Sequence, residues 1–182
     1  MIRTELEMAP EVLTGAKTQK GESLDELSRR APVLVVFLRH SGCPFCRQAL
    51  ADVSEKRQAI SAAGAQIALV HLQSDVEAAK LFARYGLDDV PRISDPGQAL
   101  YRAFQLPRGS LAQVTGPGVW REGLKSLLSG NLPGIPSADV RQMPGVFLVH
   151  DGRVLRSFRH AMSGDRPDYV DLATCPSGEQ GA

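Results

Sequence analysis

Two cysteines, Cys43 and Cys46, stand three residues apart where a predicted strand gives way to a predicted helix. An apolar run, residues 32–38, precedes them, and a helical pattern begins at Pro44. The first turn of a helix offers unpaired backbone N–H groups and the positive end of the helix dipole, which stabilise a thiolate. The spacing also lets the second sulfur reach back and form a disulfide with the first. The pattern therefore predicts redox chemistry at this dithiol.

The two thiols are predicted to have different roles. Cys43 is the predicted nucleophile, because it lies at the helix start near Arg39, His40 and Arg47, with no acidic residue close by in the sequence. Cys46 lies one turn inside the helix, where lower exposure suits a resolving thiol. The three basic residues have two interpretations. Either they tune the nucleophile or contact a substrate, or they are polar groups at the ends of the strand and the helix.

The dithiol itself also has structural interpretations. It could be half of a zinc site completed by Cys175 and a histidine, or a pair of inert core thiols. Zinc needs about four ligands and the sequence has no second CxxC motif, so redox chemistry is favoured. Pro44 suits the first helical position, where its missing N–H would have no partner, and it stiffens the loop that holds the sulfurs. Cys175 is interpreted as a tail thiol, with a second resolving role as the alternative.

Composition narrows the class of protein. The chain has 182 residues, 43% of them hydrophobic and 23% charged, which is typical of one globular domain. The net charge of +1 is spread without a basic arm, so nucleic acid is excluded as a partner. The first residues have no apolar signal region, and no apolar run is long enough to cross a membrane. Only three cysteines are present, which predicts no structural disulfide framework and a cytoplasmic location.

The order of predicted elements indicates the fold. A capping box at 23–26 opens a short helix. Further on, the sequence predicts strands at 33–39, 66–72 and 91–94, helices at 44–63, 74–86, 95–106, 119–129 and 168–173, and an Asp-Gly hairpin over 146–159. Short βαβ links imply parallel strands and the hairpin adds antiparallel ones. We therefore expect an α/β, thioredoxin-like fold whose central mixed β-sheet is flanked by helices, with a helical insertion before the C-terminal hairpin.

The expected domain organisation follows from the same elements. Residues 1–20 are interpreted as an N-terminal arm or short hairpin, residues 21–174 as the thioredoxin-like domain, and residues 175–182 as a tail. Four residues with possible ligand-binding side chains are interpreted as structural. Trp120 lies at helical spacing with leucines and is expected in the core, and three histidines are expected to be packing or surface residues: His71, His150 and His160.

Several motifs resemble those of known redox proteins. The Cys43-Pro-Phe-Cys46 motif resembles the dithiols of glutaredoxins and thioredoxins, and Met143-Pro144 resembles the thioredoxin cis-proline step. Residues 93–104 are similar to a stretch of the peroxiredoxins. Over residues 24–172 the chain most resembles the peroxiredoxin-like, AhpC/TSA-type family, in the branch of the selenoprotein-L-type and peroxiredoxin-like 2 proteins. Further supporting stretches are 118–120, 129–132, 145–149, 158–160 and 164–165.

The resemblance implies a role for Pro144, and the sequence departs from the family pattern at two positions. Pro144 is expected to be a cis-proline that faces the dithiol. Peroxiredoxins place Thr or Ser where this chain has His40, and an arginine at the equivalent of Pro144. Both of those groups polarise the peroxide. The resemblance therefore predicts a peroxide site that lacks the usual constellation.

Three functional hypotheses follow. The first is a peroxiredoxin-like antioxidant enzyme in which Cys43 attacks a peroxide or a related oxidised substrate and Cys46 resolves the product. It would need a thioredoxin- or glutathione-type electron donor, and no metal, flavin or nucleotide site is expected. The second is a thioredoxin- or glutaredoxin-like protein disulfide reductase. The third is a redox sensor or partner-binding module without catalytic turnover.

Overall fold

The computed structural model has a six-stranded mixed sheet at its centre. It describes residues 6–39, 43–109, 142–160 and 165–176. The strand order is β1-β6-β5-β2-β3-β4. β2, β3 and β4 are parallel, whereas β5 runs antiparallel to both β2 and β6, and β6 runs antiparallel to β1. The strands are β1 Leu6–Glu7, β2 Val33–Phe37, β3 Gln66–His71, β4 Arg92–Ser94, β5 Gly145–His150 and β6 Arg153–Arg159. This confirms the predicted thioredoxin-like mixed sheet.

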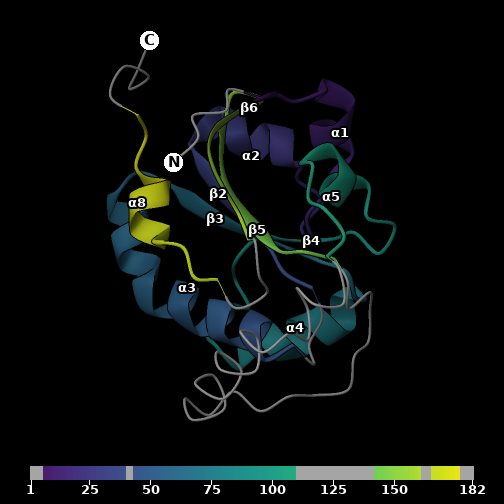
Figure 1. Ribbon diagram of the computed structural model, residues 1–182, viewed down its shortest axis with the longest axis vertical. Coiled ribbons are helices and arrows are strands. Elements are labelled where there is room, and N and C mark those ends of the chain that lie inside the picture. Colours follow the sequence, from purple (N-terminus) through teal and green to yellow (C-terminus); the bar gives the residue numbers. More distant parts are fainter. Residues whose placement is uncertain (1–5, 40–42, 110–141, 161–164, 177–182) are drawn as a thin grey trace.

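Helices cover both faces of the sheet (Figure 1). One face packs against α3, α4 and α8, and the other packs against α1, α2 and α5. The helices are α1 Pro10–Gly15, α2 Leu24–Arg30, α3 Pro44–Ala62, α4 Asp75–Ala83, α5 Ala99–Ala103 and α8 Tyr169–Ala173. Among the described residues, no helix is long and apolar enough to span a bilayer.

Strand β2 lies at the centre because both of its faces are apolar. All five of its residues are buried. Leu34 and Val36 pack into the core on the α3 side, while Val33, Val35 and Phe37 pack into the core on the α2 side. A strand buried on both faces is typical of parallel α/β sheets. Its carboxyl end leads directly toward the dithiol.

Local sequence signals define several element boundaries. The Ser23 hydroxyl accepts a hydrogen bond from the Glu26 N–H, and the Glu26 carboxylate accepts one from the Ser23 N–H, at 3.2 and 2.6 Å. This is the predicted capping box of α2. The hairpin turn is also confirmed, because Asp151 and Gly152 both have the positive φ, 45° and 75°, that a type I′ turn requires.

Helix α5 begins later than predicted. The sequence predicts a helix over 95–106, but α5 starts at Ala99. The Asp95 carboxylate accepts the N–H groups of Ala99 and Leu100, at 2.9 and 2.8 Å. Gln98 adopts a left-handed φ of 58° just before the helix. Gln98 is therefore the N-cap residue, and Asp95 bonds the first N–H groups of the helix from across an intervening turn.

The N-terminal residues belong to the same sheet and core. The sequence predicted an arm or short hairpin over residues 1–20, whereas Leu6–Glu7 forms strand β1 on β6, and helix α1 follows. Met8 and Leu13 are buried in the core on the α2 side, which explains why the segment packs. The boundary at residue 20 and the tail from residue 175 remain predictions. The expected helix at 119–129, with Trp120, lies outside the described residues.

Candidate active site

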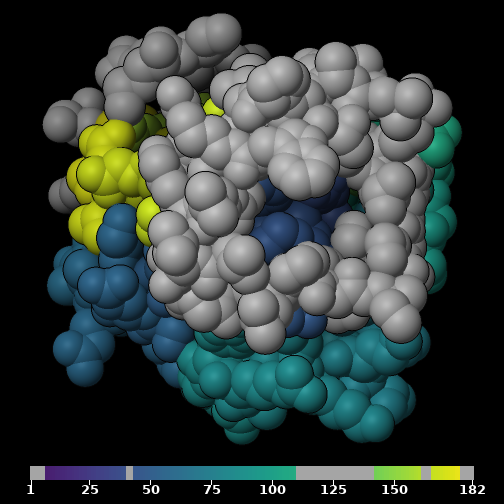
Figure 2. Space-filling model, turned by 60° about the horizontal axis from the view of Figure 1, so that its bottom comes forward, coloured from purple at the N-terminus to yellow at the C-terminus, as the bar shows by residue number. Residues whose placement is uncertain are grey.

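The dithiol lies at the junction of β2 and α3. Cys43 is the N-cap residue of the 19-residue helix α3, and Pro44 occupies its first turn as predicted. Both sulfur-bearing residues are buried, with Cys43 2% and Cys46 4% exposed. In Figure 2 the dark-blue atoms of this part of the chain are set back at the centre of the face, with the teal atoms of α4 below them. The helix N-terminus therefore meets the sulfurs inside the protein, where the dipole is poorly screened.

Arg39 contacts both sulfurs. Its Nη2 donates a hydrogen bond to Cys43 Sγ at 2.9 Å, and its backbone N–H donates one to Cys46 Sγ at 3.2 Å. The residue is only 4% exposed. Burial opposes the charge on this guanidinium, but the two cysteines hold its pKa above its ordinary value. Arg39 is therefore a cation inside the dithiol site.

The two thiols have opposite pKa shifts. Burial raises the pKa of Cys43, but the hydrogen bond from Cys46 and the charge of Arg39 outweigh it and hold that pKa well below its ordinary value. The hydrogen bond to Cys43, then burial and the charge of Cys43, raise the pKa of Cys46 well above its ordinary value. The electrostatics of the site thus favour the thiolate form at Cys43 and the thiol form at Cys46. The roles of the two thiols in a reaction remain predictions.

Tyr101 of α5 braces the strand ends that carry the site. Its hydroxyl donates to the carbonyl oxygen of Leu38 and lies 3.3 Å from that of Val70. The side chain is completely buried, and burial raises the pKa of its phenol well above the ordinary value. A buried tyrosine must satisfy its hydroxyl, and here it does so by joining the ends of β2 and β3. Leu38 directly precedes Arg39, so this contact helps to fix the backbone that supports the sulfurs.

A small cavity lies behind Cys46. Its volume is about 10 Å³, and Arg39, His71 and Gln73 form part of its wall together with Cys46. His71 is 1% exposed, and its Nδ1 lies 3.0 Å from the Gln73 carbonyl oxygen. Burial lowers the pKa of His71 to about 4, so the ring is neutral and its Nδ1–H donates to that carbonyl. His71, predicted as a packing or surface residue, therefore lies in the wall of this cavity next to Cys46.

The other residues predicted to support the site are Arg47, His40 and Pro144. Arg47 is half-buried near the start of α3, and its backbone N–H donates to the Cys43 carbonyl oxygen at 3.2 Å. His40 lies outside the described residues. Pro144 directly precedes β5, and because Phe37 pairs with Gly145, it lies at the sheet end that carries the dithiol. The functional roles of these residues remain predictions.

The predicted cis-proline is wrong. The described peptide bonds, that of Met143–Pro144 among them, are all trans. The strand that begins at Gly145 pairs with β2 and β6 directly after Pro144. The trans chain therefore enters the sheet without the turn that the motif suggested. The prediction failed because a Met-Pro step before a strand does not determine the isomer of its peptide bond.

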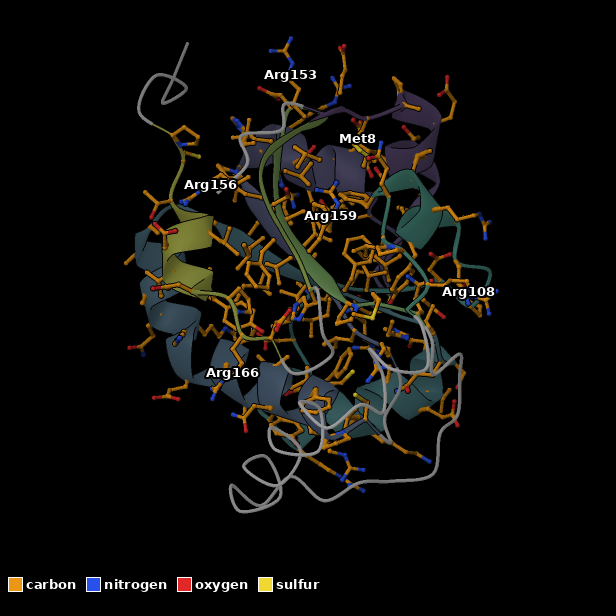
Figure 3. The ribbon with its side chains drawn as sticks, viewed as in Figure 1. Met8, Arg108, Arg153, Arg156, Arg159 and Arg166 are labelled. Carbon is orange, nitrogen blue, oxygen red and sulfur yellow. The ribbon has the colours of Figure 1, made fainter. Side chains whose placement is uncertain are left out.

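The C-terminal segment is attached to α3 by an ion pair. Arg166 donates to both carboxylate oxygens of Asp52, one of them from Nε at 3.1 Å. Asp52 is 4% exposed and also accepts a hydrogen bond from Gln48 at 3.0 Å. Figure 3 shows Arg166 alongside α3, on the same side as α8. This pair holds the segment before α8 against the helix that carries the dithiol.

The most informative residue that sequence reasoning undervalued is Arg39. It was interpreted as either a direct participant or a solvated charge at a strand end, and the structure buries it on both sulfurs. Its position after a wholly apolar strand and four residues before Cys43 was the available signal. Within the described part of the chain, no cluster of three His, Cys, Asp or Glu side chains is arranged to hold a metal ion.

Comparison with known proteins assigns the family. The fold and the buried dithiol at a strand-to-helix junction define a protein of the thioredoxin superfamily. A model of the AhpC/TSA family matches residues 7–157, so the chain belongs to that family. Its members are thiol-dependent oxidoreductases, and the chain is therefore placed in this enzyme class. The family model does not identify a branch within the family, so membership of the selenoprotein-L-type branch remains a prediction.

Individual relatives are distant. A prostamide/prostaglandin F synthase of Salmo salar is 26% identical over 175 residues, covering 92% of this chain and 86% of the relative. Peroxiredoxin Q of Xanthomonas campestris aligns with a TM-score of 0.61 at 20% identity, covering 91% of this chain and 90% of that one. Peroxidoxin BcpB of Mycobacterium tuberculosis aligns with a TM-score of 0.58 at 18% identity, covering 93% and 89%. These structural matches support the peroxiredoxin-like fold.

Proposed function

We propose that the protein is a peroxiredoxin-like thiol peroxidase in which Cys43 is the nucleophile and Cys46 the resolving thiol. One observation carries the proposal: Arg39 donates to a Cys43 sulfur whose pKa is well below the ordinary value, beside a Cys46 thiol whose pKa is raised. A thiolate is the nucleophilic form of cysteine, and a neighbouring thiol three residues away can close a disulfide.

The proposed reaction has three steps. The Cys43 thiolate attacks one peroxide oxygen, so that an S–O bond forms, the O–O bond breaks and the other oxygen leaves as an alcohol or water after taking up a proton. Cys46 then attacks the sulfenic acid, so that an S–S bond forms and the hydroxyl leaves as water. An external dithiol of the thioredoxin type, or glutathione, reduces the disulfide and restores both thiols.

Arg39 places a positive charge beside Cys43 Sγ, where negative charge moves from the sulfur to the departing peroxide oxygen in the proposed reaction. The family pattern has polarising groups at the positions of His40 and Pro144, and this chain has neither. The Arg39 guanidinium, 2.9 Å from Cys43 Sγ, is near enough to stabilise charge on the departing oxygen as well as on the sulfur. His40 and Arg47 are further proposed contacts for the substrate. We place the protein in a reducing cytoplasm, where the dithiol can be regenerated.

A protein disulfide reductase is the second candidate. The Cys-Pro-Phe-Cys motif at a helix N-terminus can equally attack a disulfide, giving a mixed disulfide that Cys46 resolves. The third candidate is a redox sensor in which the same disulfide forms without rapid turnover. All three use the same two sulfurs, so the substrate that is consumed decides among them.

Two parallel assays test the proposal. Consumption of hydrogen peroxide and of an alkyl hydroperoxide is measured with a thioredoxin-type donor, and insulin disulfide reduction is measured with the same preparation. The salmon relative's name adds a prostaglandin-type lipid to the substrates compared. Peroxidase activity that Cys43→Ser abolishes and Cys175→Ser retains supports the proposal. Insulin reduction alone supports the reductase, and activity in neither assay with reversible oxidation supports the sensor.

A further inference from the structure

We propose that Arg39 serves both thiols in succession, stabilising the Cys43 thiolate in the first step and the Cys46 thiolate in the second. This inference rests on the proposed two-step function. The two contacts come from different parts of the residue. The guanidinium donates to Cys43, and the backbone N–H donates to Cys46. A single residue thus presents a donor to each sulfur at the same time.

The backbone donor to Cys46 is held in place by the sheet. The N–H of Leu38 donates to the Val70 carbonyl oxygen at 2.8 Å, and the N–H of Leu72 donates to the Arg39 carbonyl oxygen at 3.4 Å. The Tyr101 hydroxyl donates to the Leu38 carbonyl oxygen. These bonds extend the β2–β3 pairing past the last strand residues. The Arg39 N–H therefore stays directed at Cys46 whatever happens to the side chain.

Oxidation of Cys43 removes what keeps Cys46 protonated. In the reduced site the hydrogen bond to Cys43 raises the pKa of Cys46 most, followed by burial and the negative charge of Cys43, while the charge of Arg39 lowers it. When Cys43 becomes a neutral sulfenic acid, its charge is gone and its sulfur is a much poorer acceptor. The charge and the N–H of Arg39 remain. The balance then favours a thiolate at Cys46, the form that must attack.

In the second step the Cys43–Cys46 disulfide forms and water is released. Cys46 gives up its proton, and its sulfur lone pair forms the S–S bond to Cys43. The S–O bond of the sulfenic acid breaks, and its electron pair leaves with the hydroxyl, which takes up a proton to become water. The sulfur of Cys46 is oxidised, and the sulfenic sulfur of Cys43 is reduced. Arg39 is not consumed, and its positive charge faces one thiolate before the step and another during it.

A titration of Cys46 with Cys43 replaced tests the inference directly. In Cys43→Ser, the serine supplies a neutral side chain where the sulfenic acid would stand. With 13Cβ-labelled cysteine, NMR reports the ionisation of Cys46, and Cys175→Ser assigns the other resonance. We expect the pKa of Cys46 in Cys43→Ser to lie at least about one unit below its value in the unsubstituted protein. This readout requires no peroxidase activity.

The Arg39 variants then separate its charge from its shape. In the Cys43→Ser background, Arg39→Met should raise the pKa of Cys46 by about one unit or more, and Arg39→Lys should restore part of the shift because it keeps the charge. Arg57→Met is the matched control, since Arg57 lies on the same helix as Cys46 but pairs with Asp89. It should leave the pKa of Cys46 unchanged.

The four described ionisable side chains that face the sulfurs or Arg39 are expected to keep their charge over the useful pH range. Among the described residues, those facing the sulfurs or Arg39 are Tyr101, Tyr169, His71 and His160. Burial raises the pKa of both tyrosines and lowers the pKa of both histidines to about 4. Between about pH 5 and 9 none of these four side chains is expected to change its charge, so they should not contribute to the titration that is measured for Cys46.

Kinetics supply the second arm of the test. With both cysteines present, Arg39→Lys should slow two measured rates by about tenfold: dimedone-trappable sulfenic acid formation and the later closure of the disulfide. An unchanged Cys46 pKa in folded Arg39→Met, or slowing of the first rate alone in Arg39→Lys, would overturn the inference. If the titration gives the expected shifts but peroxide is not consumed, the proposed peroxidase function fails while the electrostatic role of Arg39 stands.

Discussion

The backbone of Gly145 lies so close to Leu106 that a Cβ atom at Gly145 would be 2.6 Å from Leu106 Cδ2. The same Cβ would be 3.0 Å from the Phe147 ring and 3.3 Å from the Phe158 carbonyl oxygen. Gly145 pairs with Phe37 at the end of the sheet that carries the dithiol. This position therefore has no room for a side chain in the packed core beside the site.

Gly145→Ala is expected to lower the free energy of unfolding by about 1–3 kcal/mol, because a methyl group must displace Leu106 or the neighbouring strand. Urea denaturation measures the change. Gly97→Ala is the control, because a Cβ there meets nothing within 4 Å. Leu106→Val in the Gly145→Ala background should recover part of the loss. Equal stability of the two single glycine variants would contradict the close contact.

The reaction should stop at different steps in Cys43→Ser and Cys46→Ser. Because the pKa of Cys43 is well below its ordinary value and that of Cys46 is raised, Cys43 is expected to be the more readily ionised thiol. Cys43→Ser should abolish turnover, and Cys46→Ser should complete one reaction and retain a sulfenic acid or mixed disulfide on Cys43. Mass spectrometry after one equivalent of hydrogen peroxide identifies the adduct. An adduct on Cys46 in Cys43→Ser, formed at the rate of the unsubstituted protein, would reverse the roles.

Arg166→Gln should destabilise the protein more than the same change at Arg57. Removing Arg166 leaves the buried carboxylate of Asp52 with fewer donors, and we expect a loss of about 1–3 kcal/mol in the free energy of unfolding. Arg57 pairs with Asp89 on the surface, where both side chains are largely exposed, so Arg57→Gln should cost less than about 1 kcal/mol.

Asp52→Asn provides the complementary measurement. In the Arg166→Gln background it should recover part of the stability, since a neutral amide is easier to bury than an unpaired carboxylate. If the Arg166 and Arg57 variants lost the same stability, the ion pair with the buried carboxylate of Asp52 would have no special structural role.

Two buried histidines should make the protein less stable as the pH falls below about 6.5. Burial lowers the pKa of His71 and of His160 to about 4, so between these pH values the unfolded chain binds protons that the folded protein does not. Each histidine should thus remove about 2 kcal/mol of stability by pH 5. The groups acting on these rings include Asp75 and Arg92 for His71, and Asp165 and Arg39 for His160.

The pH dependence is checked by urea denaturation from pH 5 to 7. His71→Gln and His160→Gln should each flatten the slope of stability against pH. His150→Gln is the control, because His150 is only partly buried at the end of β5. A slope that is the same in all three variants would show that the two buried rings already bind protons in the folded protein.

The framework of the fold was predictable because it depends on local patterns. The apolar run of β2, the capping box at Ser23 and the Asp151-Gly152 turn each act over a few residues, and the structure confirms them. The start of α5 was misplaced because Asp95 caps that helix from across an extra turn. The N-terminal segment was misjudged because its burial depends on a core formed by residues far along the chain.

The sequence by itself determined that two cysteines meet a helix N-terminus after a buried strand, because residue spacing and hydrophobic pattern specify both elements. Only the tertiary structure decided that Arg39 is buried in contact with both sulfurs, that His71 and Cys46 line the same small cavity, and that the Met143–Pro144 bond is trans. Whether a charge at a strand end faces water or a thiolate depends on which neighbouring strands and helices close over it. Those contacts join residues far apart in the chain, and no local pattern encodes them.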